Sequence, residues 1–144
     1  MGTIKEDTNS DKLNNEDKLA LAMKLLTSMQ TQDWDVMRSL LTPDSYWEMP
    51  GDNILSGRSL GAEGVIAKGK LITSFRLNIQ LNHILYGDRD IAISLHNQAN
   101  RDGKILDEYL VSFCLIRGGK LGGITTYLSD IPMMDAFFGR KTEQ

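Results

Sequence analysis

The chain has 144 residues, of which 41% are hydrophobic and 24% are charged, and its formal net charge is -3. This composition is typical of one globular domain, and the slight acidity argues against a nucleic-acid surface, which needs clustered Lys and Arg. No apolar run approaches the roughly 20 residues that span a bilayer, and no signal-peptide core follows Met1. The single cysteine, Cys114, cannot form an internal disulfide, so we expect a cytoplasmic protein.

Polar residues dominate the start of the chain, and a helical pattern follows them. Residues 1–14 contain almost nothing to bury and are expected to form a solvated tail, which leaves 15–144 as a single domain. Asn15 is the predicted N-cap of the first helix, because acidic residues follow it in the first turn. The predicted buried stripe of this helix consists of Leu19, Ala22, Met23, Leu26 and Met29.

A short helix and a short strand are predicted next. Asp33 is expected to cap the helix, and Pro43 terminates it. The following run alternates with period two, which places Trp47 and Met49 on one face of a strand.

A turn at residues 56–59 is expected to open a third helix from about Leu60 to Thr73. This helix contains several glycines, and the sequence after Gly69 lacks the Ser or Thr of a phosphate loop. The glycines therefore indicate close packing against a neighbouring helix.

Three turn signals, at 87–90, 101–104 and 117–120, organise the second half of the chain. They divide residues 76–128 into four strand-like runs, and connections this short join antiparallel neighbours. Because the helical patterns lie almost entirely before this meander, the predicted fold class is α+β, with the helices on one face of a curved sheet. Such an arrangement forms a cup.

Several weak motifs occur in a recognisable order. They are a strand ending in Trp47-Glu48-Met49-Pro50, a Ser-Gly-Arg turn into a helix, and a meander that closes on Gly119-Lys120-Leu121 and Tyr127-Leu128-Ser129-Asp130. In this order the chain resembles the nuclear transport factor 2-like superfamily from Glu16 to Phe138, and within it the SnoaL-like branch of polyketide cyclases, ketosteroid isomerases and limonene epoxide hydrolases. The resemblance implies a cone-shaped, barrel-like antiparallel sheet with N-terminal helices on its concave face, a deep apolar pocket and a homodimer.

The catalytic positions of these families are not kept. The resemblance places the proton-abstracting Asp of ketosteroid isomerases at Met49, their oxyanion Tyr at about Leu25 and their second oxyanion acid at about Ser112. For limonene epoxide hydrolases, one triad Asp falls near Thr126 and the Arg-x-Asp pair falls near residues 96–98. Neither chemistry is predicted.

His96 is the candidate catalytic residue, because imidazole titrates near neutral pH. Strand alternation places it with Gln98 on one face of its strand, and both are expected to share one wall of the cup with Ser112. The alternative is a structural or surface histidine. Asp130 is the second candidate, either orienting a pocket group or capping the last turn.

The expected pocket suits an apolar small molecule and requires no cofactor. Cys114 lacks a paired base and is expected to be a buried structural thiol, and the two histidines lack the neighbours of a metal site. The residues predicted to bind substrate, some of which ordinary core packing would also explain, are Trp34, Trp47, Met49, Gln98, Leu110, Ser112, Thr126 and Leu128.

Two apolar segments need a partner surface. Residues 131–138 are too few to fold alone and are expected to form either a lid over the pocket or a dimer contact. The homodimer is also expected to use the outer face of one strand, which carries Tyr109, Val111, Phe113 and Leu115.

Two classes of function stay open. The first is a cofactor-independent isomerase, cyclase or dehydratase that acts on a polyketide-like or terpenoid-like substrate by general acid-base chemistry. The second is a non-catalytic ligand-binding or assembly module. The missing family residues favour the module, whereas a wall shared by His96, Gln98 and Ser112 would favour the enzyme.

Overall fold

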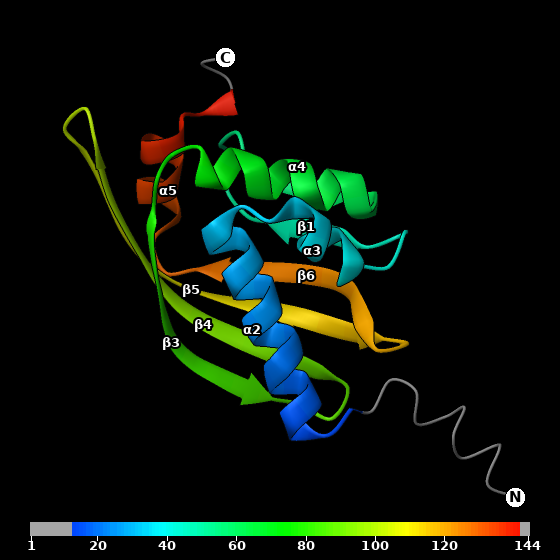
Figure 1. The fold of residues 1–144 in the computed structure, drawn as a ribbon. Helices are drawn as coiled ribbons and strands as arrows, with labels where there is room; N and C mark the ends of the chain where they lie inside the picture. The colour runs from blue at the N-terminus through cyan, green and yellow to red at the C-terminus, as the bar shows by residue number, and fades with distance from the viewer. Residues whose placement is uncertain (1–12, 142–144) are drawn as a thin grey trace, which may run out of the picture.

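The computed structural model of the protein describes residues 13–141, in which a layer of helices covers one face of a six-stranded sheet (Figure 1). The predicted tail at 1–14 lies mostly outside the described residues. The elements in chain order are α2 (Asn15–Thr31), α3 (Trp34–Ser39), β1 (Tyr46–Met49), β2 (Gly57–Leu60), α4 (Gly61–Thr73), β3 (Asn78–Tyr86), β4 (Asp90–Arg101), β5 (Lys104–Arg117), β6 (Lys120–Leu128) and α5 (Ile131–Phe138).

Long antiparallel strands joined by tight turns form most of the sheet, whose order is β2-β1-β6-β5-β4-β3. Strands β3 to β6 each pair with their neighbour in sequence, which confirms the predicted meander. The turn between β4 and β5 places Asp102 and Gly103 at φ values of 52° and 82°, the left-handed geometry that suits a two-residue hairpin. The sheet curves around the helices without closing (Figure 1).

The two short strands differ from the prediction. β1 runs parallel to β6, with Trp47 opposite Ile124, so the sheet is mixed rather than purely antiparallel. Residues 57–59, predicted to lie in a turn, and Leu60, predicted to begin the third helix, form β2 and pair antiparallel with β1. None of the four residues is buried, so β2 needs no alternation of apolar and polar residues. The pairing with β1 holds them extended.

α2 lies across the concave face of the sheet, and its buried stripe is rotated from the predicted one. Asn14, not Asn15, is the N-cap, and its Oδ1 accepts a hydrogen bond of 2.8 Å from the backbone N of Asp17. Leu19 and Met23 are 42% and 38% exposed. The apolar residues that α2 buries are Leu21, Ala22, Leu25, Leu26 and Met29.

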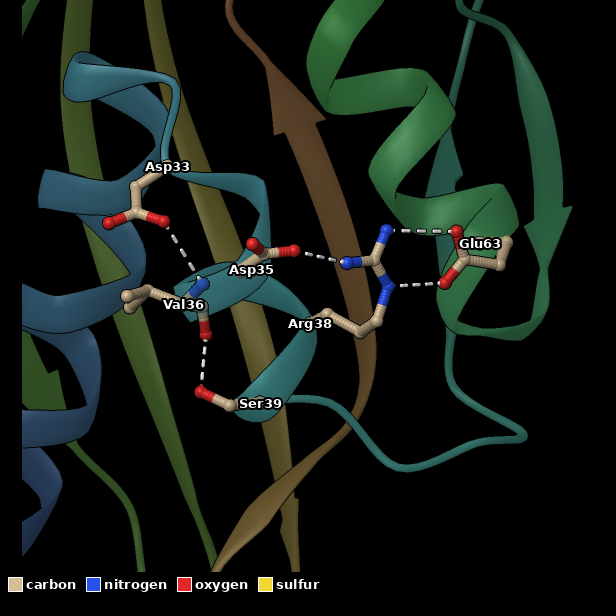
Figure 2. A network of polar contacts seen from close by, with 6 residues as sticks. All are labelled: Asp33, Asp35, Val36, Arg38, Ser39 and Glu63. Carbon is tan, nitrogen blue, oxygen red and sulfur yellow. Dashed lines mark hydrogen bonds and ion pairs between the residues drawn. The ribbon is translucent and has the colours of Figure 1, made fainter.

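α3 and α4 are joined by an exposed ion-pair network (Figure 2). Asp33 caps α3 as predicted, accepting a hydrogen bond from the backbone N of Val36. Arg38 donates from Nε and Nη2 to the two carboxylate oxygens of Glu63 at 2.6 and 3.0 Å, and from Nη1 to Asp35 at 2.9 Å. Because water screens these charges, the network orients the two helices more than it stabilises the fold.

α4 packs closely on α2 and α3 and is fixed to the sheet. A Cβ added at Gly69 would lie 3.0 Å from Sδ of Met29 and 3.1 Å from the ring of Trp34, which confirms close helix packing. The neighbouring Lys68 donates from Nζ to backbone oxygens of Trp47 in β1 and of the first residue of β2 at 3.0 and 2.9 Å. Burial lowers the pKa of this ammonium group to about 8.

α5 follows β6 and docks against the same chain. Asp130 caps it, with Oδ1 accepting a hydrogen bond of 3.0 Å from the backbone N of Met133. Asp135 accepts from Nδ2 of Asn53 at 2.8 Å and from the backbone N of Asp52 at 2.9 Å, which ties α5 to the loop after β1. No helix within residues 13–141 is long and apolar enough to cross a membrane.

Candidate functional site

A cavity of about 70 Å³ lies between the concave face of the sheet and the covering helices. Its walls come from α2, α4, α5 and five of the six strands, and nearly all of the side chains are apolar. Strand alternation explains the sheet walls, because every second residue of a strand points to the helix-covered side. The lining residues include Leu25, Trp47, Met49, Ile93, Asn97, Leu110, Ser112, Leu128, Met134 and Phe138.

A chain of hydrogen-bonded side chains enters this apolar cavity. Nε1 of Trp47 donates to Oγ1 of Thr126 at 2.9 Å, and that oxygen lies 2.8 Å from Oγ of Ser112. All three residues are buried. If Thr126 donates onward to Ser112, the Ser112 hydroxyl hydrogen is available to a ligand; in the opposite direction its lone pairs are. Either way, this Trp47–Thr126–Ser112 relay presents one oriented hydroxyl to the cavity.

The strand register brings the relay together. Ser112 of β5 stands directly opposite Thr126 of β6, and Trp47 of β1 stands opposite Ile124, two residues earlier in β6. The sequence places Ser112 and Thr126 near each other through the predicted hairpin. The parallel pairing that adds Trp47 joins segments far apart in the chain, so local patterns carry no signal for it.

A second polar group enters the wall from β4. Asn97 lines the cavity, and its Oδ1 is enclosed without a hydrogen-bond partner. Directly opposite it in β5 lies Glu108, which is 0% exposed. Its Oε2 accepts hydrogen bonds from Oγ of Ser129 at 2.5 Å and from the backbone N of Asp130 at 2.8 Å, while Oε1 has no partner. Burial raises the pKa of the Glu108 carboxyl.

His96 lies on the convex face of the sheet, away from the cavity. Its ring stacks on Tyr109, the residue directly opposite in β5, with ring centroids 4.1 Å apart. Its Nε2 lies 2.5 Å from Oδ1 of Asp107, which also accepts a weak 3.5 Å hydrogen bond from Gln98. This is the surface environment that we gave as the alternative for His96.

The expectation that His96 and Gln98 share a wall with Ser112 is therefore wrong. Ser112 stands opposite Ile93, and both line the cavity, so the cavity face of β4 is that of the odd-numbered residues from Ile93 to Asn97. His96 and Gln98 are even-numbered. The prediction grouped each strand's residues correctly but joined the wrong groups across the ladder.

The remaining predicted residues divide between the wall and its surroundings. Asp130 is the exposed cap of α5, and Trp34 packs against the outside of the core near Gly69 without lining the cavity. Thr126 is buried behind the wall and acts on it through Ser112. The predicted residues that line the cavity are Trp47, Met49, Leu110, Ser112 and Leu128.

Sequence reasoning missed Asn97 and Glu108. Asn97 alternates in phase with Ile93 and Leu95, and Glu108 alternates in phase with Leu106 and Leu110, so each is a polar residue within an apolar face. That break in the pattern was a usable signal. The α5 residues Met134 and Phe138 also line the cavity, which places the C-terminal helix at the site.

No described side chain lining the cavity is ionisable. Cys114 is fully buried, and burial raises the pKa of its thiol to about 12, so it is an inert structural residue. Within residues 13–141, no three His, Cys, Asp or Glu side chains are grouped as metal ligands.

Known proteins similar to this chain were found by structure and not by sequence. No protein-family model and no curated protein sequence matches it. A nuclear transport factor 2-like protein from Burkholderia xenovorans LB400 superposes with a TM-score of 0.76 at 14% identity, covering 88% of this chain and 98% of that one. The chain has the nuclear transport factor 2-like fold.

Two further solved structures superpose on the chain over most of its length. A SnoaL-like polyketide cyclase homologue from Jannaschia sp. CCS1 has a TM-score of 0.69 at 15% identity, covering 86% of this chain and 93% of that one. TerC, crystallised with polyporic acid, has a TM-score of 0.73 at 12% identity, covering 85% of this chain and 99% of that one. At these identities the similarity establishes the fold alone.

Three positions matched to ketosteroid isomerase catalytic residues converge in the structure. Leu25, Met49 and Ser112 come from α2, β1 and β5, and all three line the cavity. The resemblance therefore pointed to residues that line this cavity, although two of the three positions carry apolar side chains.

Proposed function

We propose that this protein binds an apolar small molecule in the cavity between α2, α5 and the concave face of the sheet. The observation that carries the proposal is the Trp47–Thr126–Ser112 relay, which aims one hydroxyl into an otherwise apolar space. A few oriented polar groups in an apolar wall are typical of small-molecule sites.

The size of the cavity adds a condition. At about 70 Å³ it is smaller than the roughly 150 Å³ engineered cavity that binds benzene. A ligand with a ring must therefore displace wall side chains. The wall contains Met29, Met49 and Met134, and methionine adapts its shape at low cost because it is unbranched and flexible.

The structural neighbours support a ligand of this kind. TerC was crystallised with polyporic acid, and the Jannaschia homologue is named for polyketide cyclisation. By analogy, the ligand of this chain belongs to the polyketide-like or terpenoid-like molecules, with an apolar ring skeleton and oxygen substituents.

The test uses methylenecyclohexane as an apolar probe. Its affinity is measured by ligand-observed NMR for the wild type, for Leu110→Phe, which fills the cavity, and for Tyr109→Phe, which changes the convex face. The larger side chain in Leu110→Phe takes up space that the probe needs, and overfilling a packed space costs about 1–3 kcal/mol. We therefore expect the affinity for the probe to fall about ten-fold or more. Tyr109→Phe should leave the affinity unchanged. Absence of binding to the wild type, or equal binding by Leu110→Phe, would contradict the proposal.

A second candidate is a SnoaL-like isomerase, cyclase or dehydratase that works by acid-base chemistry. The convergence of Leu25, Met49 and Ser112 on the cavity favours it, because these positions match an isomerase site. Its probe is the isomerisation of cyclohex-3-enone to cyclohex-2-enone, in which the Ser112 hydroxyl would bind the carbonyl oxygen and a water molecule would take the proton from the α-carbon and return one to the γ-carbon. Turnover above the solvent rate that falls in Ser112→Ala supports the enzyme. An isomerisation rate equal to the rate in solvent alone would contradict the enzyme and favour the non-catalytic binding protein.

We further propose a homodimer through the convex face. Aromatic and aliphatic side chains remain exposed there, among them Tyr109 and Phe113 of β5 and Tyr127 of β6, at 54%, 45% and 59%. An exposed cluster of this kind is common at interfaces between copies.

A further inference from the structure

Two enclosed oxygen atoms without hydrogen-bond partners lie on neighbouring strands beside the cavity. They are Oδ1 of Asn97 and Oε1 of Glu108, and among residues 13–141 only Oγ of Ser45 shares this state. Asn97 and Glu108 are direct partners in the β4–β5 ladder. Since a buried acceptor without a donor is costly, their pairing on one rung needs an explanation.

Glu108 stands between the cavity wall and the start of α5. Its Oε2 accepts from Oγ of Ser129 at 2.5 Å and from the backbone N of Asp130 at 2.8 Å. These bonds hold Oε2 on the side of the β6–α5 junction and leave Oε1 without a donor, and on its other side β5 pairs with β4. There Asn97, 9% exposed, is the residue that lines the cavity.

As the side chains lie, two facing acceptors can satisfy each other if one of them carries a proton. The alternative is an Asn97 amide turned over, whose NH2 would donate to a charged Glu108 and whose oxygen would face the cavity. That alternative buries a carboxylate with no cation beside it, which is costly. Directly opposite residues in an antiparallel ladder have Cβ atoms about 4.5–5.5 Å apart, within reach of a side-chain hydrogen bond. A proton on Oε1 of Glu108 lets it donate to Oδ1 of Asn97, while Oε2 keeps both of its donors. Every oxygen of the pair then has a partner.

We propose that Glu108 is a neutral carboxylic acid in the folded protein, that it donates a hydrogen bond to Oδ1 of Asn97, and that the Asn97 amide N–H thereby becomes the donor for a ligand carbonyl oxygen. The inference rests on the proposed function and names the ligand group: an apolar molecule that carries a carbonyl. A hydrogen bond at an amide oxygen polarises the amide and strengthens its N–H as a donor. Glu108 is in this account a positioning residue for Asn97.

The charges around Glu108 favour the neutral acid. Burial raises the pKa of its carboxyl and the negative charge of Asp130 raises it further, although the hydrogen bonds from Ser129 and from the Asp130 backbone oppose this. On β4 the facing residue is the uncharged Asn97. Arg101, further along β4, has its guanidinium 4.2 Å from the centre of an aromatic ring of the core edge.

The direct test is the pH titration of the Glu108 side-chain carboxyl by 13C NMR in the full chain, with the signal assigned by its loss in Glu108→Gln. We expect the chemical shift of a protonated acid at pH 7, and ionisation at a higher pH than for an ordinary glutamate. The shift of a carboxylate at pH 7 would overturn the proposal whether or not any ligand binds.

Glu108→Gln also gives a stability test, because glutamine repeats the proposed bonds: its oxygen accepts from Ser129 and Asp130, and its NH2 donates to Asn97. An acid whose pKa is raised by folding stabilises the fold at low pH and loses that contribution as pH rises. We therefore expect Glu108→Gln to melt several degrees above the wild type at pH 8, and equally near pH 4. A lower melting temperature at pH 8 would contradict the proposal, since a charged Glu108 would then be holding α5. Asp107→Asn, on the opposite face, is the matched control.

The ligand part is tested with two probes of the same shape, cyclohexanone and methylenecyclohexane. The ratio of their affinities is compared between the wild type and Asn97→Leu by NMR titration. We expect the preference for the ketone to fall about three-fold to ten-fold in Asn97→Leu. An unchanged ratio with both probes bound would refute the carbonyl assignment and leave the binding function intact. Failure of both probes to bind the wild type would contradict the binding function, and the carbonyl assignment with it.

Discussion

The two faces of β4 and β5 are built from alternating residues of the same strands, yet they provide very different surfaces. The concave face carries Ser112 and Asn97 within an apolar wall beneath the helices. The convex face carries the stacked His96 and Tyr109 and the half-exposed Phe113. Alternation decides which residues of a strand share a face, but the helices that cover the sheet decide which face becomes a cavity. Each polar residue of β4 and β5 must therefore be assigned to one face of the sheet before a function is inferred from it.

The largest expected effect is on assembly through the convex face. Phe113→Glu places a charge within the proposed dimer contact, and Ser112→Ala, one residue away on the other face, is its control. We expect light scattering to report twice the 16.1 kDa chain mass for the wild type and for Ser112→Ala, and the single chain mass for Phe113→Glu. A wild-type monomer at micromolar concentration would remove the interface from the account.

On the concave face, the strongest effect on stability is expected from Thr126→Val. The substitution keeps the shape but leaves the buried indole N–H of Trp47 without an acceptor, which costs about 1–3 kcal/mol. Thr125→Val, on the opposite face of β6, should change the free energy of unfolding by less than about 0.5 kcal/mol. Urea denaturation of both variants measures the difference. Equal costs would show that the relay does not matter for stability.

Ser112→Ala is expected to be milder, because it removes the last hydroxyl of the relay and Thr126 still accepts from Trp47. We expect a loss of about 0.5–1.5 kcal/mol in the free energy of unfolding, together with weaker binding of cyclohexanone. Ser94→Ala, on the convex side of β4, is the control and should affect neither quantity. Ketone binding that is unchanged in Ser112→Ala would contradict a role for the relay in the cavity.

The smallest effect is expected for His96→Ala. Its ring stacks on Tyr109 and bonds to the exposed Asp107 outside the cavity, so we expect unchanged binding of both probes and a stability loss below about 1 kcal/mol. Probe titration and thermal melting measure both quantities. Loss of probe binding in a folded variant would mean that the convex face contributes to the site.

Most of the fold could be predicted because its signals are local. Tight turns and period-two alternation determine β3 to β6, and side-chain caps at Asp33 and Asp130 begin α3 and α5. The parallel pairing of β1 with β6 depends on contacts between distant segments, which no local pattern encodes. The short strand β2 pairs with the nearby β1, but its residues show no period-two burial that would have identified it as a strand.

The candidate site was predictable only in part, because contacts between segments that are distant in the sequence complete it. Trp47, Met49 and Ser112 follow from alternation and from the family resemblance. His96 was misplaced because its chemistry, rather than its register opposite Tyr109, decided the prediction. On α2, Leu19 and Leu21 each begin a stripe of apolar residues at helical spacing. Only packing against the sheet shows that the stripe of Leu21 is the buried one.

The measurement that tests the central claim most directly is the map of backbone amide shifts when methylenecyclohexane is added to 15N-labelled protein. The account predicts perturbations at Trp47, Asn97 and Ser112, including the indole N–H of Trp47, and none at His96 or Tyr109. Perturbations confined to the convex face, or none at saturating probe, would contradict the claim that the cavity on the concave face is the binding site.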